Sequence, residues 1–551
     1  MNFDRIWHKA YQSGVPREVE FEEITLPEML TRTARRYPDH TALFYMGTVI
    51  TYRELEGLVN RFARSLSGLG VNPGDKVAML LPNLPQIVIA DFATFRIGAT
   101  TVMNNPLYTE TELEYQFNDS GANVAVTLDL LLPKVVQLKE RTGITSIISC
   151  SAGDYLPASL KGEEKKDELP PGVYRFVDLI EDVPDDPVDN AARWDDVGNI
   201  MYTGGTTGVS KGVLLTHANL SMNTQQFRAW FYDLENGEES MLAVFPFFHA
   251  AGYTGMQNNC VYAGWANVLV PRPDPDMIVK IIEMAKPTLV PGVPTIFVGL
   301  LQNERFRQMD FSFLKSFIAG GGPLAVETIR QLKELKDVPL VNVYGLTEIS
   351  PMGTATPWRG VEKPDTVGIP FPSTDLKIVD VETGEQEMAL GDAGEILFKG
   401  PQVMQGYLNK PEESVAALRD GWVHSGDIGF LDEDGYLTIV DRKKDVIVAS
   451  GYNVYPKEID EVLFEHPDII EACTIGIPDE YRGETVKAYV VPKAGVSIDI
   501  DELTRFCREK LAAYKVPRII ESVDSLPKSA VGKILRRELR DTDRKKRKQR
   551  Q

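Results

Sequence analysis

Short apolar runs alternate with helical stretches along much of the chain, and this rhythm limits the folds open to it. Runs such as 76–81, 122–127 and 340–343 have the length of buried strands. In stretches such as 86–98 and 324–335, apolar residues recur every three or four positions, as on a helix with one buried face. Because parallel strands need crossover connections, usually helices, the alternation predicts an α/β fold with parallel sheets.

A run rich in glycine and hydroxyl side chains, Tyr-Thr-Gly-Gly-Thr-Thr-Gly-Val-Ser-Lys-Gly at 202–212, follows the apolar pair Ile200 and Met201. Glycines let the backbone turn tightly and bring its N–H groups close to an anion, while the hydroxyls and the lysine add donors and a positive charge. The run therefore predicts a polyphosphate site; an ordinary strand-to-helix turn is the alternative. A kinase-type P-loop is excluded, because Ser210 stands where its second glycine is needed and Gly212 where its hydroxyl residue is needed. The expected phosphate-binding residues are Thr203, Gly204, Gly205, Thr206, Thr207, Gly208 and Lys211.

This run resembles the signature loop of the adenylate-forming superfamily, which includes acyl- and aryl-CoA synthetases, beetle luciferases and the adenylation domains of peptide synthetases. It departs from the family's pattern at Gly204, usually Ser, and at Ser210, usually Pro. Further segments similar to the family's motifs follow in the family's order, so the resemblance runs nearly end to end. These segments are 246–252, 320–324, 343–348, 394–396, 406–407, 424–429, 441–445, 450–451 and 527–533. Within the superfamily the chain is most similar to medium- and long-chain fatty-acid–CoA ligases.

The resemblance implies a two-part architecture. A large N-terminal domain of parallel-sheet α/β subdomains plus a β-barrel-like subdomain would hold the ATP and acyl sites over 1–441. A small, mobile C-terminal α/β domain over 442–539 would carry the catalytic lysine and the CoA loop. The basic tail 540–551 lacks apolar periodicity, so we expect it to be disordered and solvated; a weak contact with acidic lipid headgroups is the alternative.

The same resemblance implies a reaction in two steps. A carboxylic acid attacks the α-phosphate of ATP, which gives acyl-AMP and pyrophosphate, and the thiol of CoA then displaces AMP. The first step needs charge neutralisation and positioning more than covalent work by the protein. ATP and CoA are therefore the expected cosubstrates, and Mg2+ is the expected metal.

Catalytic residues are expected from their match to the family's motifs, and they are Lys533, Thr347, Glu348 and His249. Glu348 would hold Mg2+ through a carboxylate oxygen, and Thr347 would hydrogen-bond the α-phosphate. Lys533 would neutralise the α-phosphate and the acid carboxylate during adenylation. If the resemblance is set aside, the alternative for Thr347 is the N-cap of a helix and the alternative for Lys533 is a solvent-exposed charge.

The nucleotide site implied by the resemblance extends beyond the loop. Tyr344 would pack its ring against adenine, and Asp427 and Arg442 would bind the ribose hydroxyls. Taken alone, Asp427 is simply a turn residue after glycine. Gly321 and Gly322 complete the expected nucleotide-binding set.

The C-terminal part is implied to serve the thiol step. Lys444 would be the hinge on which the small domain rotates after adenylation. Rotation would bring Ser450, Gly451 and Tyr452 to CoA, where Gly451 leaves room for pantetheine beside the backbone.

The expected acyl pocket consists of His249, Tyr253, Gly320 and Gly322. Ala250 and Ala251 stand where an amino-acid substrate would need a nearby acid, so a peptide-synthetase domain is disfavoured. We expect a medium- or long-chain fatty acid, with Tyr253 as an aromatic gate; core packing is the alternative for that ring. An aryl acid, coumarate-like or benzoate-like, is the runner-up. A luciferase-like oxygenase and a non-catalytic sensor of acyl groups or nucleotides rank below both.

Composition narrows the class of partner. The formal charge of −20 argues against nucleic acid as the main partner, because phosphate backbones require clustered cations.

The four cysteines are widely spaced and suggest neither a zinc site nor disulfides. The most apolar window, 80–102, contains Asp91 and Arg96, so we expect no transmembrane segment. With no signal-peptide pattern at the N-terminus, we expect a cytoplasmic enzyme acting on small molecules, and a homodimer stays open.

Overall fold

The chain divides into a larger and a smaller unit. The larger comprises Arg5–Leu376 and Phe398–Val423, and the smaller comprises Lys377–Leu397 and His424–Gln551. This division does not coincide with the boundary expected at residue 442, which stays a prediction. The computed structural model describes residues 5–161, 168–203, 210–322, 324, 326–449, 452–479, 482–493, 495–529, 532 and 534–550, apart from the side chains of 453 and 547–550.

One of the two large sheets has eight strands in the order β19-β9-β8-β4-β3-β5-β6-β7. The strands from β8 to β7 run parallel, whereas β9 and β19 are antiparallel additions at one edge. The apolar runs 76–81 and 122–127 are confirmed as β3 and β5. The strand bounds are β3 (Lys76–Leu80), β4 (Thr100–Met103), β5 (Val124–Leu128), β6 (Ser146–Cys150), β7 (Val173–Arg175), β8 (Val197–Thr203), β9 (Lys211–Thr216) and β19 (Gly406–Tyr407).

The second large sheet has nine strands in the order β16-β15-β14-β13-β12-β10-β11-β1-β2. Its central strands from β14 to β1 are parallel, and the expected strand at 340–343 is confirmed within β14. The bounds are β1 (Thr41–Tyr45), β2 (Thr48–Thr51), β10 (Ser240–Ala243), β11 (Ala266–Leu269), β12 (Leu289–Gly292), β13 (Ser316–Gly320), β14 (Leu340–Gly345), β15 (Met352–Ala355) and β16 (Ile369–Pro370). The α/β fold with parallel sheets is therefore confirmed.

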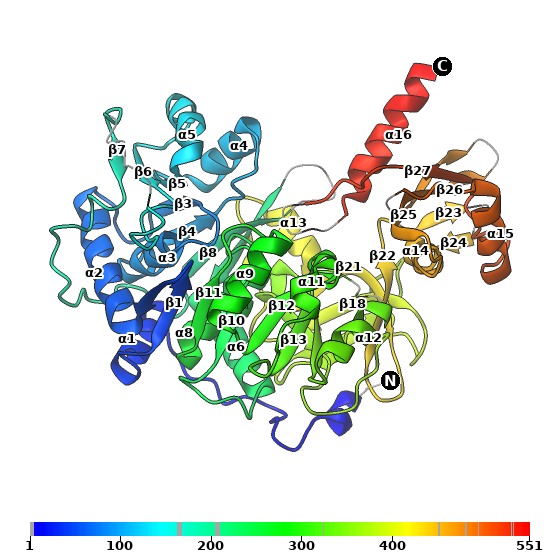
Figure 1. The fold of residues 1–551 in the computed structure, drawn as a ribbon, viewed down its shortest axis with the longest axis horizontal. Helices are drawn as coiled ribbons and strands as arrows, with labels where there is room; N and C mark the ends of the chain where they lie inside the picture. Colours follow the sequence, from blue (N-terminus) through cyan, green and yellow to red (C-terminus); the bar gives the residue numbers. More distant parts are fainter. Residues whose placement is uncertain are drawn as a thin grey trace. The chain divides into compact units, whose positions relative to one another are not determined.

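Helices flank both sheets (Figure 1). On the eight-stranded sheet, α4 and α5 pack over β3, β5 and β6 through a buried cluster that includes Leu80, Phe117, Val135 and Ile147. The helices of the larger unit are α1 (Leu26–Arg36), α2 (Tyr52–Gly68), α3 (Pro85–Arg96), α4 (Glu110–Ser120), α5 (Leu132–Leu138), α6 (His217–Trp230), α7 (Ala250–Gly252), α8 (Asn259–Ala263), α9 (Pro275–Ala285), α10 (Pro294–Gln302), α11 (Glu304–Arg307), α12 (Val326–Leu335) and α13 (Pro411–Ala417). Short turns of other helical types are η1 (Ile6–Ala10), η2 (Asp129–Leu131), η3 (Lys139–Arg141), the π-helix η4 (Tyr253–Asn258) and η5 (Thr347–Ile349).

Helix α3 is buried along its whole length, which explains the apolar window around it. Its Arg96 is 2% exposed and donates to Glu56 at 2.9 Å, so the buried charge is paired. Its Asp91 accepts two hydrogen bonds from η4. Among the described residues, no helix has the length and apolar character needed to cross a bilayer.

Two five-stranded sheets complete the chain. The first has the order β17-β18-β21-β20, with β22 beside β21. The second has the order β24-β23-β26-β25, with β27 parallel to β26. The strands are β17 (Asp375–Val379), β18 (Gly394–Lys399), β20 (Leu418–Arg419), β21 (Trp422–Leu431), β22 (Leu437–Arg442), β23 (Ile447–Ala449), β24 (Tyr452–Val454), β25 (Ile469–Asp479), β26 (Gly483–Pro492) and β27 (Ile519–Ser522). The smaller unit's helices are α14 (Pro456–Phe464), α15 (Ile500–Lys510) and α16 (Arg536–Arg550).

The basic tail differs from our expectation, because α16 extends over the stretch from residue 540 that we expected to be disordered. Leu539 is 7% exposed and packs in a cluster with Tyr489. Asp543 accepts an ion-paired hydrogen bond from Lys487 at 2.7 Å. A buried leucine and a buried carboxylate therefore help to anchor a helix that has no continuous apolar stripe.

Candidate active site

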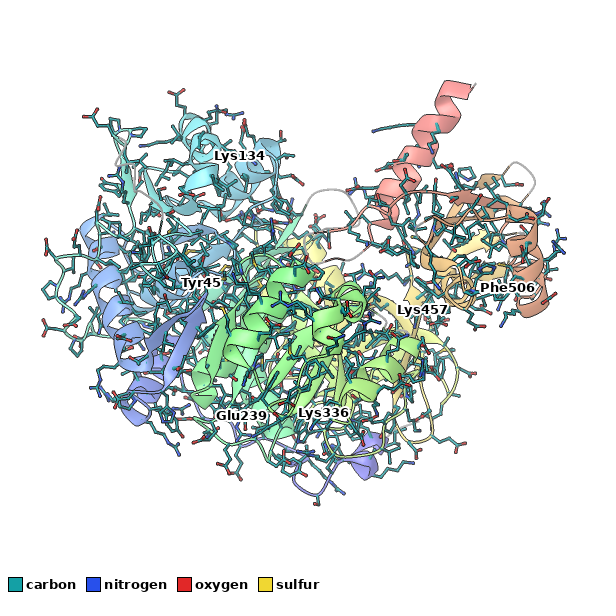
Figure 2. The ribbon with its side chains drawn as sticks, viewed as in Figure 1. Tyr45, Lys134, Glu239, Lys336, Lys457 and Phe506 are labelled. Carbon is teal, nitrogen blue, oxygen red and sulfur yellow. The ribbon has the colours of Figure 1, made fainter. Side chains whose placement is uncertain are left out.

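Several expected site residues of the larger unit, Gly320 and Tyr344 among them, lie at the carboxyl ends of parallel strands in the nine-stranded sheet. Gly320 ends β13 and pairs in register with Val343 of β14, which Tyr344 follows directly. Tyr45, the last residue of β1, and Glu239, just before β10, are labelled in Figure 2 and mark the carboxyl and amino edges of this sheet. Open α/β sheets bind ligands outside their carboxyl edge. The residues thus converge where a ligand is expected.

The glycine-rich run joins the two strands of a hairpin. β8 ends at Thr203 and β9 begins at Lys211, which faces Thr203 across the antiparallel pair. A second strand follows the run, so the alternative of a strand-to-helix turn is wrong. The remaining expected phosphate contacts, Gly204, Gly205, Thr206, Thr207 and Gly208, lie outside the described residues.

Helix α4 contacts the two strands of this hairpin where they meet the glycine-rich loop. The hydroxyl of Tyr115 donates to the carbonyl oxygen of Ser210 at 3.1 Å, and that of Tyr202 donates to Asp119 at 2.8 Å. Burial, and then the neighbouring Asp119, raise the pKa of Tyr202, so its phenol stays a donor. Both ends of the run are therefore held in place.

Tyr407 connects Lys211 with Glu348. The Nζ atom of Lys211 lies 4.9 Å from the centroid of the Tyr407 ring, and the hydroxyl of Tyr407 donates to Oε1 of Glu348 at 2.9 Å. Burial first, and then Glu348, raise the pKa of Tyr407. Our site prediction omitted Tyr407, although the Gly406-Tyr407 motif was the signal that could have found it.

Thr347 and Glu348 lie on the short helix η5 directly after β14. A methyl group on Gly345 would lie 1.8 Å from the carbonyl oxygen of Pro351, so only glycine fits this turn. The N-cap position of η5 is Leu346, which excludes the alternative of Thr347 as the cap. The carbonyl of Glu348 accepts from the N–H of Met404 at 2.9 Å, which fixes the segment near β19.

Three consecutive glycines, Gly320, Gly321 and Gly322, lie at the carboxyl end of β13. Gly321 has φ of +77°, a conformation that L side chains rarely adopt. A methyl group on Gly320 would lie 3.3 Å from the carbonyl oxygen of Val343, whereas one on Gly322 would make ordinary contact with Pro294. The ring of Tyr344 lies 5.9 Å from that of Phe398, centroid to centroid.

His249 caps the short helix α7. Its Nδ1 atom accepts from the N–H of Ala251 at 3.2 Å, so a neutral ring carries its proton on Nε2. A methyl group on Gly252 would lie 2.3 Å from the carbonyl oxygen of Pro246, so the chain packs tightly here. The half-buried His249 therefore has a fixed ring orientation at the carboxyl edge of the sheet.

Tyr253 is fully buried, and its hydroxyl donates to Oδ1 of Asp91 at 3.0 Å. Gln257 donates to the other carboxylate oxygen at 2.6 Å. Burial raises the pKa of Asp91 to about 7, and hydrogen bonds from Tyr253, Gln257 and Thr101 oppose that shift. The structure thus places the proposed gate residue in a buried polar network, and its gating role stays a prediction.

In the smaller unit, Asp427 and Arg442 face each other across β21 and β22. The Nε atom of Arg442 lies 3.3 Å from Oδ1 of Asp427. Tyr452 is 58% exposed and stacks on Tyr514 with ring centroids 4.8 Å apart. Lys444 lies exposed in the turn after β22. Ser450, Gly451 and Lys533 lie outside the described residues.

Two models of known protein families match the sequence of this chain. A model described as AMP-binding enzyme matches residues 30–408. A second, described as AMP-binding enzyme C-terminal domain, matches residues 458–533. The expected superfamily membership is thereby confirmed.

Curated relatives match the chain over nearly its full length. A long-chain-fatty-acid–CoA ligase of Bacillus subtilis is 42% identical over 98% of both chains. The ligase of the same name from Yersinia pestis is 39% identical over 98% of both. A feruloyl-CoA synthase of an Amycolatopsis species is 36% identical over 92% of this chain and 97% of its own.

Solved structures have the same fold and bind nucleotides. ATP-bound MatB from Rhodopseudomonas palustris has a TM-score of 0.85 at 29% identity, over 94% of this chain and 99% of its own. An anthranilate CoA ligase in complex with anthranoyl-AMP also has a TM-score of 0.85, at 27% identity over 94% and 97%. The chain belongs to the AMP-binding enzymes, the adenylate-forming superfamily.

Proposed function

We propose that this protein is an AMP-forming acid–CoA ligase whose acid is a medium- or long-chain fatty acid. The observation that carries the proposal is the 42% identity with the Bacillus subtilis ligase over 98% of both chains. The arrangement of Lys211, Tyr407 and Glu348 supports it, because these side chains can bind phosphate and a hard cation.

In the first step, a carboxylate oxygen of the acid bonds to the α-phosphorus of ATP while the bond to pyrophosphate breaks. Thr203 and Lys211, at the two ends of the hairpin loop, would bind the leaving pyrophosphate. Thr347 would donate to the α-phosphate, and Tyr344 would contact adenine. Fixed donors aimed at developing charge stabilise such a transition state without reorganising.

Glu348 is the side chain that would hold Mg2+. Within the described part of the chain, no three or more His, Cys, Asp and Glu side chains group into a metal site. Mg2+ bound through one or two carboxylates and substrate phosphates needs no such group, and the carboxylate of Glu348 provides the hard oxygen ligand it prefers. When bound, the ion neutralises phosphate charge.

From the smaller unit, Asp427 and Arg442 would bind the ribose hydroxyls. A carboxylate accepts from hydroxyls and a guanidinium donates to them, so the pair suits a sugar. Lys533 would neutralise the α-phosphate and the acid carboxylate during adenylation.

In the second step, the sulfur of CoA bonds to the acyl carbon and AMP leaves with the electron pair. The thiol proton goes to water, because a thiol of ordinary pKa is partly ionised at neutral pH and needs no dedicated base. We keep Lys444 as the hinge and Ser450, Gly451 and Tyr452 as CoA contacts.

An aryl acid is the second candidate substrate. The feruloyl-CoA synthase of Amycolatopsis is 36% identical, which favours this alternative over other acids. The glycines Gly320, Gly321 and Gly322 place no side chain on the wall, so a flat ring would also fit.

The direct test is AMP release from ATP with CoA and Mg2+ over a panel of acids from acetate through C6, C10 and C16 to benzoate and 4-coumarate. A maximum among the saturated acids of C10 and C16 supports the proposal, whereas a maximum on the aryl acids favours the second candidate. Silence with every acid, together with no pyrophosphate exchange, would leave a non-catalytic sensor. Light emission or O2 consumption would identify an oxygenase.

Cytoplasmic location and a homodimer are separate proposals about the same enzyme. Cell fractionation tests the first, and light scattering of the purified protein tests the second. Recovery with membranes, or a mass near 61.4 kDa, would contradict them.

A further inference from the structure

Glu395 is a buried carboxylate on β18 for which the proposed reaction provides no role. The residue is 5% exposed. Its Oε1 atom accepts from the backbone N–H of Gly426 at 3.2 Å, and its Oε2 atom lies 3.1 Å from Nζ of Lys443. Nδ1 of His424 lies 3.6 Å from the same Oε2 atom. The carboxylate therefore binds two separate segments of the smaller unit.

Burial of a carboxylate is costly unless charge and hydrogen bonds compensate it. Here the compensation comes from Lys443, which is 42% exposed, and from the N–H of Gly426. Gly394, the preceding residue, fits only as glycine, because a methyl group would lie 2.2 Å from the carbonyl oxygen of Val379. The position of Glu395 is thus fixed by tightly packed backbone.

The two partners of Glu395 flank the pair proposed to bind ribose. Gly426 directly precedes Asp427, and Lys443 directly follows Arg442. The N–H of Lys443 also donates to the carbonyl oxygen of Gly426 at 2.9 Å, and Asp427 faces Arg442 in register. Gly426 has φ of +69°, so β21 has, directly before Asp427, a backbone conformation that few residues adopt.

We propose that Glu395 is a positioning residue that sets Asp427 and Arg442 for recognition of the ribose hydroxyls of ATP. The proposal rests on the proposed function. The carboxylate binds the backbone N–H of Gly426, beside Asp427, and the side chain of Lys443, beside Arg442. Its removal would therefore loosen the chain next to both members of the pair. The loss would fall on contacts to the ribose hydroxyls and spare contacts to the acid.

The experiment compares kcat/KM for ATP with kcat/KM for 2′-deoxy-ATP and 3′-deoxy-ATP in the full-length protein. We expect Glu395→Ala to reduce the preference for ATP about tenfold, since removal of one partner of a hydrogen bond to a charged group has about this effect, while the KM for the acid stays unchanged. Glu395→Gln keeps an acceptor for Gly426 but loses the charge facing Lys443, so an intermediate preference is expected. A structural defect alone would slow all three nucleotides equally.

Glu239→Gln is the matched control. Glu239 is 2% exposed and pairs with Lys315 at 2.6 Å, so it is also a buried carboxylate bound to a lysine. It precedes β10 at the amino edge of its sheet, opposite the edge that carries the candidate site. Its substitution should leave the nucleotide preference unchanged.

The outcomes separate the inference from the proposed function. If the wild type releases no AMP with any acid, the proposed function fails. If the wild type is active but shows no preference for ATP, or if Glu395→Ala slows all three nucleotides equally, the inference is overturned. Should Glu395→Ala fail to fold, Glu395→Gln decides: a reduced preference supports the inference, and an unchanged one contradicts it.

Discussion

The hydroxyl of Tyr407 donates a hydrogen bond to Oε1 of Glu348 at 2.9 Å, while Lys211 lies 4.9 Å from the centroid of the same ring. One aromatic side chain thus touches the proposed metal ligand and the lysine at the end of the glycine-rich hairpin loop. Tyr407 lies on β19, which pairs with β9, so the strand that begins at Lys211 also positions the tyrosine.

Tyr407→Phe should separate these two contacts. The ring stays below Lys211, but the hydrogen bond to Glu348 is lost, so we expect AMP formation to fall about tenfold. The dependence of the rate on Mg2+ concentration should shift to higher concentrations. Tyr11→Phe is the control, because it removes a hydrogen bond of similar length, 2.8 Å to the carbonyl oxygen of Pro370. An unchanged Mg2+ dependence would contradict the role.

Lys533→Ala should lose adenylation and keep the thiol step. Loss of one preorganised contact to developing charge slows such reactions about a hundred- to thousandfold. Pyrophosphate exchange measures the first step, and CoA thioester formation from supplied acyl-adenylate measures the second. Lys510→Ala, which removes a lysine paired with Glu465, serves as control. Equal loss of both steps would refute the assignment.

Gly345→Ala should damage the turn that carries Thr347 and Glu348. The added methyl would lie 1.8 Å from the carbonyl oxygen of Pro351, and relief of such overpacking typically costs about 1–3 kcal/mol. We expect a lower thermal midpoint and a loss of AMP formation. Gly68→Ala is the control, since no atom lies within 4 Å of its added methyl. Similar behaviour of the two variants would contradict the steric argument.

Asp91 should make stability depend on pH. Burial raises the pKa of Asp91 from 3.8 to about 7, so between these values the folded protein binds a proton that the unfolded chain releases. This contribution to stability is complete below the unfolded pKa and is lost as the pH rises to about 7. Asp91→Asn lacks this titration. The thermal midpoint of this variant relative to that of the wild type should therefore rise from pH 5 to 7, and the difference should stay constant above pH 7.

Thermal unfolding from pH 5 to 8 tests the Asp91 prediction. Asp39→Asn, which alters a side chain that is 81% exposed, provides the comparison. A constant difference between Asp91→Asn and the wild type over this range would contradict the raised pKa.

Arg536→Ala should destabilise the smaller unit. Arg536 donates to Asp460 at 2.6 Å and lies 3.7 Å from Asp441, so its loss leaves buried carboxylates uncompensated, at a cost of about 3 kcal/mol. Hydrogen exchange of α14 and α16 should become faster. Arg537→Ala is the control, because its side chain is 63% exposed and pairs only loosely with Asp541 at 3.8 Å. Equal exchange in both variants would count against the network.

Much of the fold could be predicted from the sequence, because periodicity within a window is a local property. The runs at 76–81 and 122–127 became β3 and β5, and the stretch at 86–98 became α3. The bond between Tyr253 and Asp91 could not be predicted in this way, since 162 positions separate the two residues. Nothing near Tyr253 in the sequence indicates its partner.

The tail helix shows the same limit. Apolar periodicity alone predicts no structure beyond residue 539. In the fold, however, Asp543 forms an ion pair with Lys487 on β26, far away in the sequence. At the candidate site, Thr347 and Glu348 lie just after β14, the strand that contains the expected run at 340–343, and their roles stay predictions. The Gly406-Tyr407 motif marks Tyr407 in the sequence, but its contacts with Glu348 and Lys211 depend on the pairing of β19 with β9, which the sequence does not indicate.

The placement of the site residues after strands such as β13 and β14 has an evolutionary consequence. The strand core is built from backbone pairing and buried apolar side chains, so it tolerates sequence drift in the segments that leave its edge. If Tyr253 lines the acyl pocket and Glu348 holds Mg2+, as we expect, a lineage can exchange the residues around Tyr253 and acquire a new acid while it retains Glu348. One ancestral scaffold could in this way give rise to both alkyl and aryl ligases.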